Sequence, residues 1–85
     1  MPEVSRFLGI VIQMYFSDHG PPHFHAKYGE YRITVDINSG DVEGTFPRRA
    51  LAMVLDWYME HIDELRDNWE RARTDQPLVR ISPLE

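Results

Sequence analysis

The chain has 85 residues, no cysteine and a formal net charge of −5 at pH 7. This length leaves room for one small domain, and the lack of cysteine excludes a disulfide framework and a thiolate zinc site. The 42% hydrophobic content is too high for a disordered chain. Acidic residues outnumber basic ones in both halves. This balance argues against nonspecific binding to duplex DNA, which depends on neutralising many phosphates, and we expect no sequence-specific duplex binding either.

Residues 7–46 are predicted to form an antiparallel sheet of three to four strands. The stretch 7–16 is rich in β-branched and aromatic residues, as strands are, and the glycine and prolines at 20–22 end it. A second strand at 23–28 and a third at 31–37 flank a two-residue hairpin turn at Gly29 and Glu30. A short fourth strand is expected at 41–46, after the turn that contains Gly40.

Residues 47–73 are predicted to form one long amphipathic helix. Its apolar stripe recurs at spacings of three and four, at Leu51, Val54, Leu55, Tyr58, Ile62, Leu65 and Trp69. The tail 74–85 follows, and the alternation at 78–81 permits a short edge strand. We therefore expect residues 1–85 to be a single α+β domain of ββββα order, with one face of the sheet packed on the helix.

The start of the chain lacks the basic and apolar stretch of a secretory signal. The longest apolar stretch, at 8–16, is interrupted by Gln13 and is too short to span a bilayer. We therefore expect a cytoplasmic protein without membrane association.

The strand period of two sorts the side chains of the sheet onto two faces. The apolar set is expected to face the helix: Ile10, Ile12, Met14, Phe16, Phe24, Ala26, Tyr28, Tyr31, Ile33, Val35, Ile37, Val42 and Phe46. The opposite set is polar and includes His23, His25, Lys27, Arg32, Thr34, Asp36 and Glu43. Because no second helix is predicted, this polar face is expected to be open, and it is where we place a site.

Three of the four histidines fall within seven residues, at His19, His23 and His25. His23 and His25 stand two apart on one strand, so their rings are expected on the same face within about 6–7 Å. Two imidazoles so placed could act as a catalytic acid and base without a cofactor. They could also chelate a divalent metal, with Asp18 or His19 as a third ligand. The alternative is that the histidines only hydrogen-bond to neighbouring groups.

Cations for a ligand or anion site are predicted at Lys27 and Arg32 on the open face and at Arg48 and Arg49 where the helix starts. Arginines at a helix N-terminus interact unfavourably with the helix dipole, and each typically destabilises the helix by about 0.3–1 kcal/mol. The same place suits phosphate, because guanidinium groups and free backbone N–H groups both donate to it. The alternative is that the two arginines pair with nearby carboxylates or lie in solvent.

Several short strings together resemble the bacterial domain-of-unknown-function 4160 family over nearly the whole chain. They are Ser5-Arg6-Phe7, Met14-Tyr15-Phe16, Asp18-His19, Pro21-Pro22-His23-Phe24-His25-Ala26, Tyr28-Gly29-Glu30 and Gly44-Thr45-Phe46-Pro47. The resemblance implies a small standalone protein, often encoded beside another small domain in an arrangement similar to toxin–antitoxin pairs. It suggests a toxin-like role with a small protein partner and implies no assigned catalytic residues.

Three functional hypotheses follow. In the first, a toxin–antitoxin-like component acts on RNA or another phosphodiester, with His23 and His25 as acid and base. In the second, the chain is a non-enzymatic interaction or regulatory module that pairs with a neighbouring small protein. In the third, it binds a metal. The residue pattern leaves open whether the chain is an enzyme.

Overall fold

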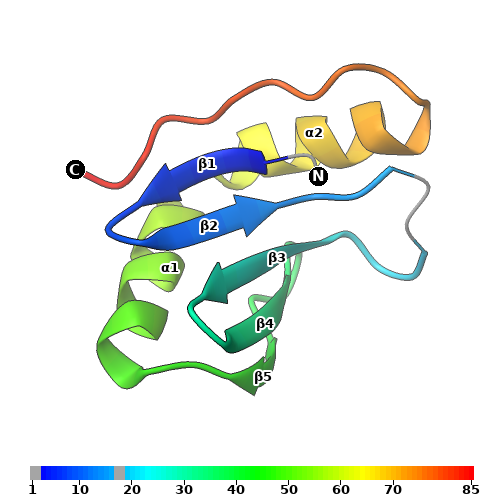
Figure 1. Cartoon of the computed structure of the whole chain (residues 1–85). Coiled ribbons are helices and arrows are strands. Elements are labelled where there is room, and N and C mark those ends of the chain that lie inside the picture. The colour runs from blue at the N-terminus through cyan, green and yellow to red at the C-terminus, as the bar shows by residue number, and fades with distance from the viewer. Residues whose placement is uncertain (1–2, 17–18) are drawn as a thin grey trace.

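The computed structural model describes residues 3–16 and 19–85. Within these residues one antiparallel sheet, of order β1-β2-β3-β4-β5, is followed by two helices (Figure 1). The strands are β1 (Glu3–Phe7), β2 (Ile10–Gln13), β3 (His23–Tyr28), β4 (Tyr31–Asp36) and β5 (Val42–Thr45), and the helices are α1 (Arg48–Glu60) and α2 (Ile62–Arg73). The α+β prediction is confirmed, but the sheet has five strands where three to four were predicted, and two helices replace the one long helix.

The additional strand arises because the stretch predicted as one strand, 7–16, belongs to a hairpin. The chain reverses at Leu8 and Gly9, whose φ angles are both positive, at 51° and 82°. Two successive positive φ angles match the twist of an antiparallel pair, so Phe7 pairs directly with Ile10. Leucine seldom adopts a positive φ, and the sequence pattern therefore did not indicate this turn.

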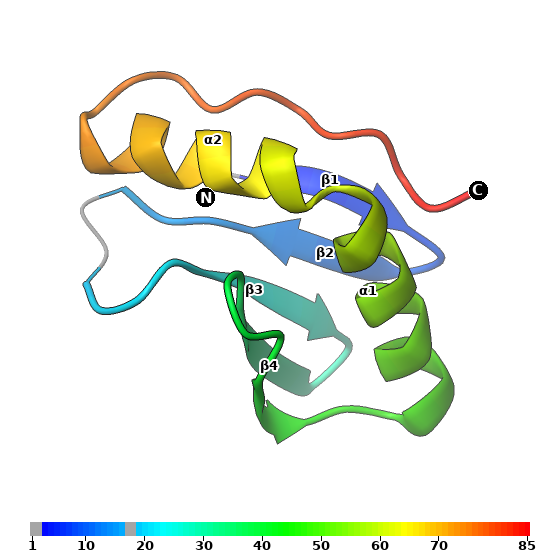
Figure 2. The same ribbon diagram turned by 180° about the vertical axis from the view of Figure 1, so that it is seen from behind.

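The predicted helix 47–73 is divided at His61, whose φ of −127° and ψ of 25° lie outside the helical range. The His61 N–H donates to the Tyr58 carbonyl at 3.1 Å and closes α1, whereas its own carbonyl accepts from Leu65 N–H at 2.9 Å and opens α2. The two helices consequently point in different directions while covering the same face of the sheet (Figure 2). Neither is long and apolar enough to cross a membrane.

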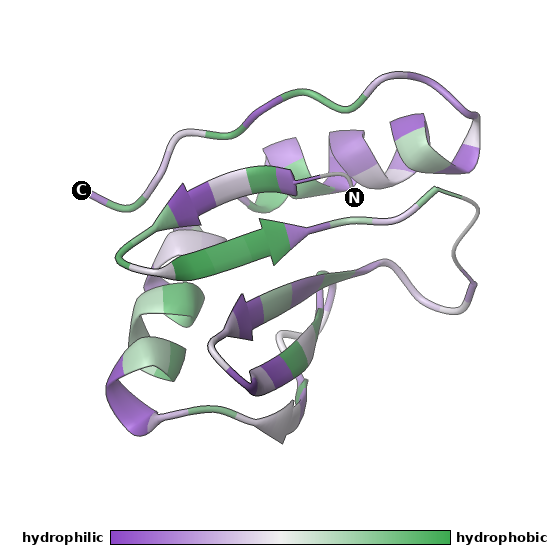
Figure 3. Cartoon of the chain, in the orientation of Figure 1, coloured by the Kyte–Doolittle hydropathy of each residue, from purple (hydrophilic) through white to green (hydrophobic). Residues whose placement is uncertain are grey.

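The core lies between this face and the helices. Phe24 is fully buried, with its ring 5.7 Å from that of Trp57 and 6.0 Å from that of Tyr58. Figure 3 shows β2 as a nearly continuous hydrophobic strand and α1 as more hydrophobic than α2. Most of the predicted apolar set is buried, Val42 and Phe46 are half-buried, and three members at or beyond strand ends are exposed: Phe16, Tyr28 and Tyr31.

The tail after α2 runs along β1 and closes that edge of the sheet (Figure 1). Ile81 is buried, and its N–H donates to the Val4 carbonyl at 2.8 Å. The Asn68 amide holds Val79 by two bonds of 2.8 Å, donating from Nδ2 to the carbonyl and accepting at Oδ1 from the N–H. The edge of β1 is therefore covered by the chain itself, without regular secondary structure in the tail.

Candidate functional site

The face of the sheet opposite the helices is crossed by rows of facing side chains, set by the strand register. The rows are Arg6-Val11-Lys27-Arg32-Thr45, then Gln13-His25-Thr34-Glu43, then His23-Asp36. Within the described ranges the two helices cover the other face (Figures 1 and 2), and of their side chains Trp69 of α2 reaches the ring of His23 on this one, which we call the open face. The first row is cationic, and carboxylates appear in the other two. Charge is therefore separated along the strand direction.

His23 and His25 project from the open face as predicted, because the intervening Phe24 is buried under the helices. Their ring centroids are 5.1 Å apart. The His25 ring also lies 4.6 Å from Tyr15, edge to face. The His23 ring lies 5.1 Å from Trp69 of α2. Aromatic neighbours thus hold both imidazoles, and the contact with Trp69 was not foreseen from the sequence.

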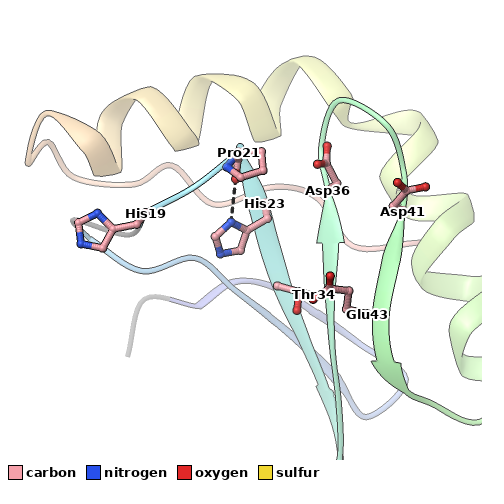
Figure 4. A pocket seen from close by; sticks show the side chains of 7 residues that line it. All are labelled: His19, Pro21, His23, Thr34, Asp36, Asp41 and Glu43. Carbon is pink, nitrogen blue, oxygen red and sulfur yellow. Dashed lines mark hydrogen bonds between the residues drawn. The ribbon is translucent and has the colours of Figure 1, made fainter.

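The orientation of His23 is fixed by its own loop. Its Nδ1 lies 2.9 Å from the Pro21 carbonyl oxygen (Figure 4). A carbonyl only accepts, so Nδ1 must carry the proton of this bond. In the neutral ring the lone pair is then on Nε2.

Beside His23 the open face is hollowed by about 340 Å³ (Figure 4). Three of its seven lining residues are carboxylates and two are histidines: the lining is His19, Pro21, His23, Thr34, Asp36, Asp41 and Glu43. Three strands and two loops supply these residues. Hereafter this depression is called the acidic hollow.

Asp36 anchors the turn that brings Asp41 into the acidic hollow. Its Oδ1 accepts from Ser39 N–H at 2.9 Å and from Asn38 N–H at 2.8 Å, and its backbone N–H donates to the Asp41 carbonyl at 2.9 Å. The Ser39 N–H above all, together with that of Asn38 and the nearby charge of His23, holds the pKa of the Asp36 carboxyl below its usual value. Asp36 therefore carries its negative charge throughout the neutral range.

The predicted metal ligands are only partly brought together. His19 and His23 line the acidic hollow, and His25 lies in the neighbouring row. Across residues 3–16 and 19–85 no three histidine, aspartate or glutamate side chains are placed to hold a metal ion. Asp18 lies outside the described residues. Metal binding stays a prediction.

The predicted cations are not at the acidic hollow. Lys27 and Arg32 face each other across β3 and β4 at the opposite end of the open face. Arg48 and Arg49 are exposed at the start of α1 and do not line the hollow. In the part of the chain that the structure describes, none of the four makes an ion pair with a carboxylate.

The carboxylates of the acidic hollow are the residues that sequence reasoning did not assign to a site. Strand alternation placed Asp36 and Glu43 on the open face, and that signal could have identified them. Asp41 had no such signal, because its position depends on the turn at 37–40. Together with His23 these groups form an arrangement suited to a guanidinium or ammonium group, which carboxylates bind through charge-assisted hydrogen bonds.

Comparisons with known proteins add one finding. Neither curated proteins nor solved structures gave a significant match. One family model matches residues 9–70, from the first hairpin turn into α2, and so spans the acidic hollow and both histidines of β3. As this range is well over half of the 85 residues, the chain belongs to the family described as Domain of unknown function (DUF4160).

Proposed function

We propose that this chain is a non-enzymatic protein-interaction module, whose open face docks a partner and whose acidic hollow receives a basic side chain of that partner. The observation that carries the proposal is the convergence of Asp36, Asp41 and Glu43 beside His23. Arginine suits such a site, because its planar guanidinium donates to several carboxylate oxygens at once. A toxin–antitoxin-like pairing with a small neighbouring protein is one form that this function takes.

The distribution of charge favours this role over action on RNA. A phosphate in the acidic hollow would face three carboxylates, and repulsion between like charges opposes its binding. Lys27 and Arg32, which could neutralise it, lie at the other end of the strands. The phosphodiester hypothesis therefore has less support from the geometry than the interaction hypothesis.

A defined probe for the proposal is N-acetyl-arginine N-methylamide, followed by amide chemical shifts of the ¹⁵N-labelled full chain. We expect saturable shifts at Thr34, Asp36 and Asp41, with weak affinity because a single side chain makes few contacts. The citrulline analogue has nearly the same shape without the charge, and we expect it to leave these amides unchanged. Equal shifts with both compounds would contradict the proposal.

A variant pair locates the binding. Glu43→Gln keeps the size of the side chain and should weaken arginine binding about two- to fivefold, as expected for loss of one exposed charge. Asp67→Asn is the matched control, because Asp67 lines a separate acidic depression between α2 and the tail. An Asp67→Asn effect as large as that of Glu43→Gln would place the binding elsewhere. Inorganic phosphate, titrated in the same way, should not shift the hollow; saturable phosphate shifts there would favour the phosphodiester hypothesis instead.

A further inference from the structure

On the open face the two ends of β4 carry opposite charges. On β4, Arg32 and Asp36 stand two residues to either side of Thr34. On β3, Lys27 and His23 stand two residues to either side of His25, and His25 pairs with Thr34. A half-turn about a line through His25 and Thr34, across the strands, therefore exchanges the cationic end with the acidic end.

From this pattern we infer that the partner docked by the open face is a second copy of this chain. The inference rests on the proposed function and identifies the basic side chain as Arg32 of the other copy. Such a pair has two-fold symmetry, so each copy contributes the same surface and each contact occurs twice. Arg32 of each copy enters the acidic hollow of the other.

Strand geometry supports the match. Two residues of strand span about 6.7 Å, so Arg32 and Asp36 lie at equal distances on either side of the axis. When the two faces are stacked antiparallel, Arg32 of one copy lies opposite Asp36 of the second copy. Sheets that pack face to face are about 10 Å apart, a gap that an arginine and a carboxylate side chain bridge together.

A second copy would also offset a charge repulsion that exists within the isolated chain. Lys27 and Arg32 are direct cross-strand neighbours, and like charges in that position destabilise a sheet. Within the described ranges neither has a carboxylate partner. In the stacked pair, carboxylates of the other copy, Asp36 and Asp41, lie over this end. The two like charges, Lys27 and Arg32, then face carboxylates of opposite charge.

The area of the open face sets the affinity expected for the dimer. Strands about 4.8 Å apart and about five residues long give a contact of roughly 350 Å² per copy. That is less than half of the roughly 800 Å² per partner in a standard stable interface. We therefore expect a weak, reversible dimer that must be measured on the full chain from about 10 μM to about 2 mM, and dimer should form within that range.

The first experiment is sedimentation equilibrium of the wild type and two variants. Arg32→Glu places a carboxylate opposite Asp36 of the other copy and should raise the dimer Kd at least about tenfold. Arg49→Glu changes the net charge equally but lies at the start of α1 and should change Kd less than about twofold. Both side chains are exposed, so both variants should fold. A wild type that is monomeric at 2 mM, or equal weakening by both variants, would overturn the inference.

The second experiment places the contact. The chain has no cysteine, so Glu30→Cys in the turn between β3 and β4 provides a single spin-label site. The half-turn carries this position over residues 38–40 of the other copy, whose amides should broaden in a mixture of labelled and ¹⁵N-labelled chains. Broadening at α1 or α2 instead would overturn the inference. Saturable arginine binding by a chain that stays monomeric would overturn only the second copy and keep the proposed function.

Discussion

The two faces of the sheet differ although the same strands build both. On β3, Phe24 lies in a dry layer against the aromatic rings of α1, whereas the adjacent His25 lies on the open face with a histidine and a tyrosine as ring neighbours. Because successive side chains of a strand point to opposite faces, neighbouring residues have different roles: one stabilises the core, and the next is available for recognition. Changes on the covered face should affect folding, and changes on the open face should affect binding.

The largest effect should come from Phe24→Ala. Phe24 is fully buried between Trp57 and Tyr58, and truncation leaves a cavity that the rigid sheet cannot close. We expect a loss of about 3–5 kcal/mol in the free energy of unfolding, measured by urea titration followed by circular dichroism. For a domain of this size that is a large fraction of the total stability.

His25→Ala is the matched control for Phe24→Ala, one residue further along the same strand. Its loss should be below about 1 kcal/mol, as for most substitutions outside the core. Comparable losses of unfolding free energy in the two variants would show that the covered face does not contribute more to stability than the open face.

A smaller effect tests a polar residue on the covered side. Asn68 is buried and makes two hydrogen bonds to the Val79 backbone. Asn68→Ala leaves both Val79 groups without that partner and should cost about 1–3 kcal/mol in the free energy of unfolding. The Val79 amide should also exchange faster with solvent. Asn38→Ala, in the exposed turn after β4, serves as the control, and an unchanged Val79 exchange rate would argue against a docked tail.

The smallest effect should be an acid-induced loosening of the contact between β1 and the tail. Hydrogen bonds from Arg6 and from Arg80 lower the pKa of Glu3 from 4.5 to about 2. Because the folded pKa is depressed, this stabilising contribution is complete above pH 4.5 and is lost as the pH falls through about 2. NMR titration of the Glu3 carboxyl carbon, with Ile81 amide exchange as the tail readout, checks this. Titration of Glu3 near 4.5 would show that the contacts are absent in solution.

Those parts of the fold that depend on local pattern were predictable. The hairpin at Gly29 and Glu30 has a glycine where the turn requires a positive φ, and β3 and β4 alternate cleanly on either side of it. The same alternation assigned His23 and His25 to the face away from Phe24. Short-range periodicity is sufficient for such features, because each residue is placed by its immediate neighbours.

Features that depend on unusual backbone or distant contacts were not predictable. Leu8 has a positive φ that leucine rarely adopts, and the break at His61 falls within an apolar stripe whose spacing continues undisturbed. In the site, Trp69 reaches His23 from 46 residues further along the chain. Asp41 joins the acidic hollow through the turn at 37–40. These placements are set by tertiary packing, which a single-sequence pattern does not encode.

The most direct measurement of the division between the faces uses a soluble gadolinium chelate and compares proton relaxation in two adjacent rings of β3. A dilute sample of Arg32→Glu, which we expect to be monomeric, keeps a second copy from covering the open face. The His23 ring protons should relax strongly with added chelate, and those of Phe24 should be nearly unaffected. Strong relaxation of Phe24 with protection of His23 would contradict the assignment of the two faces.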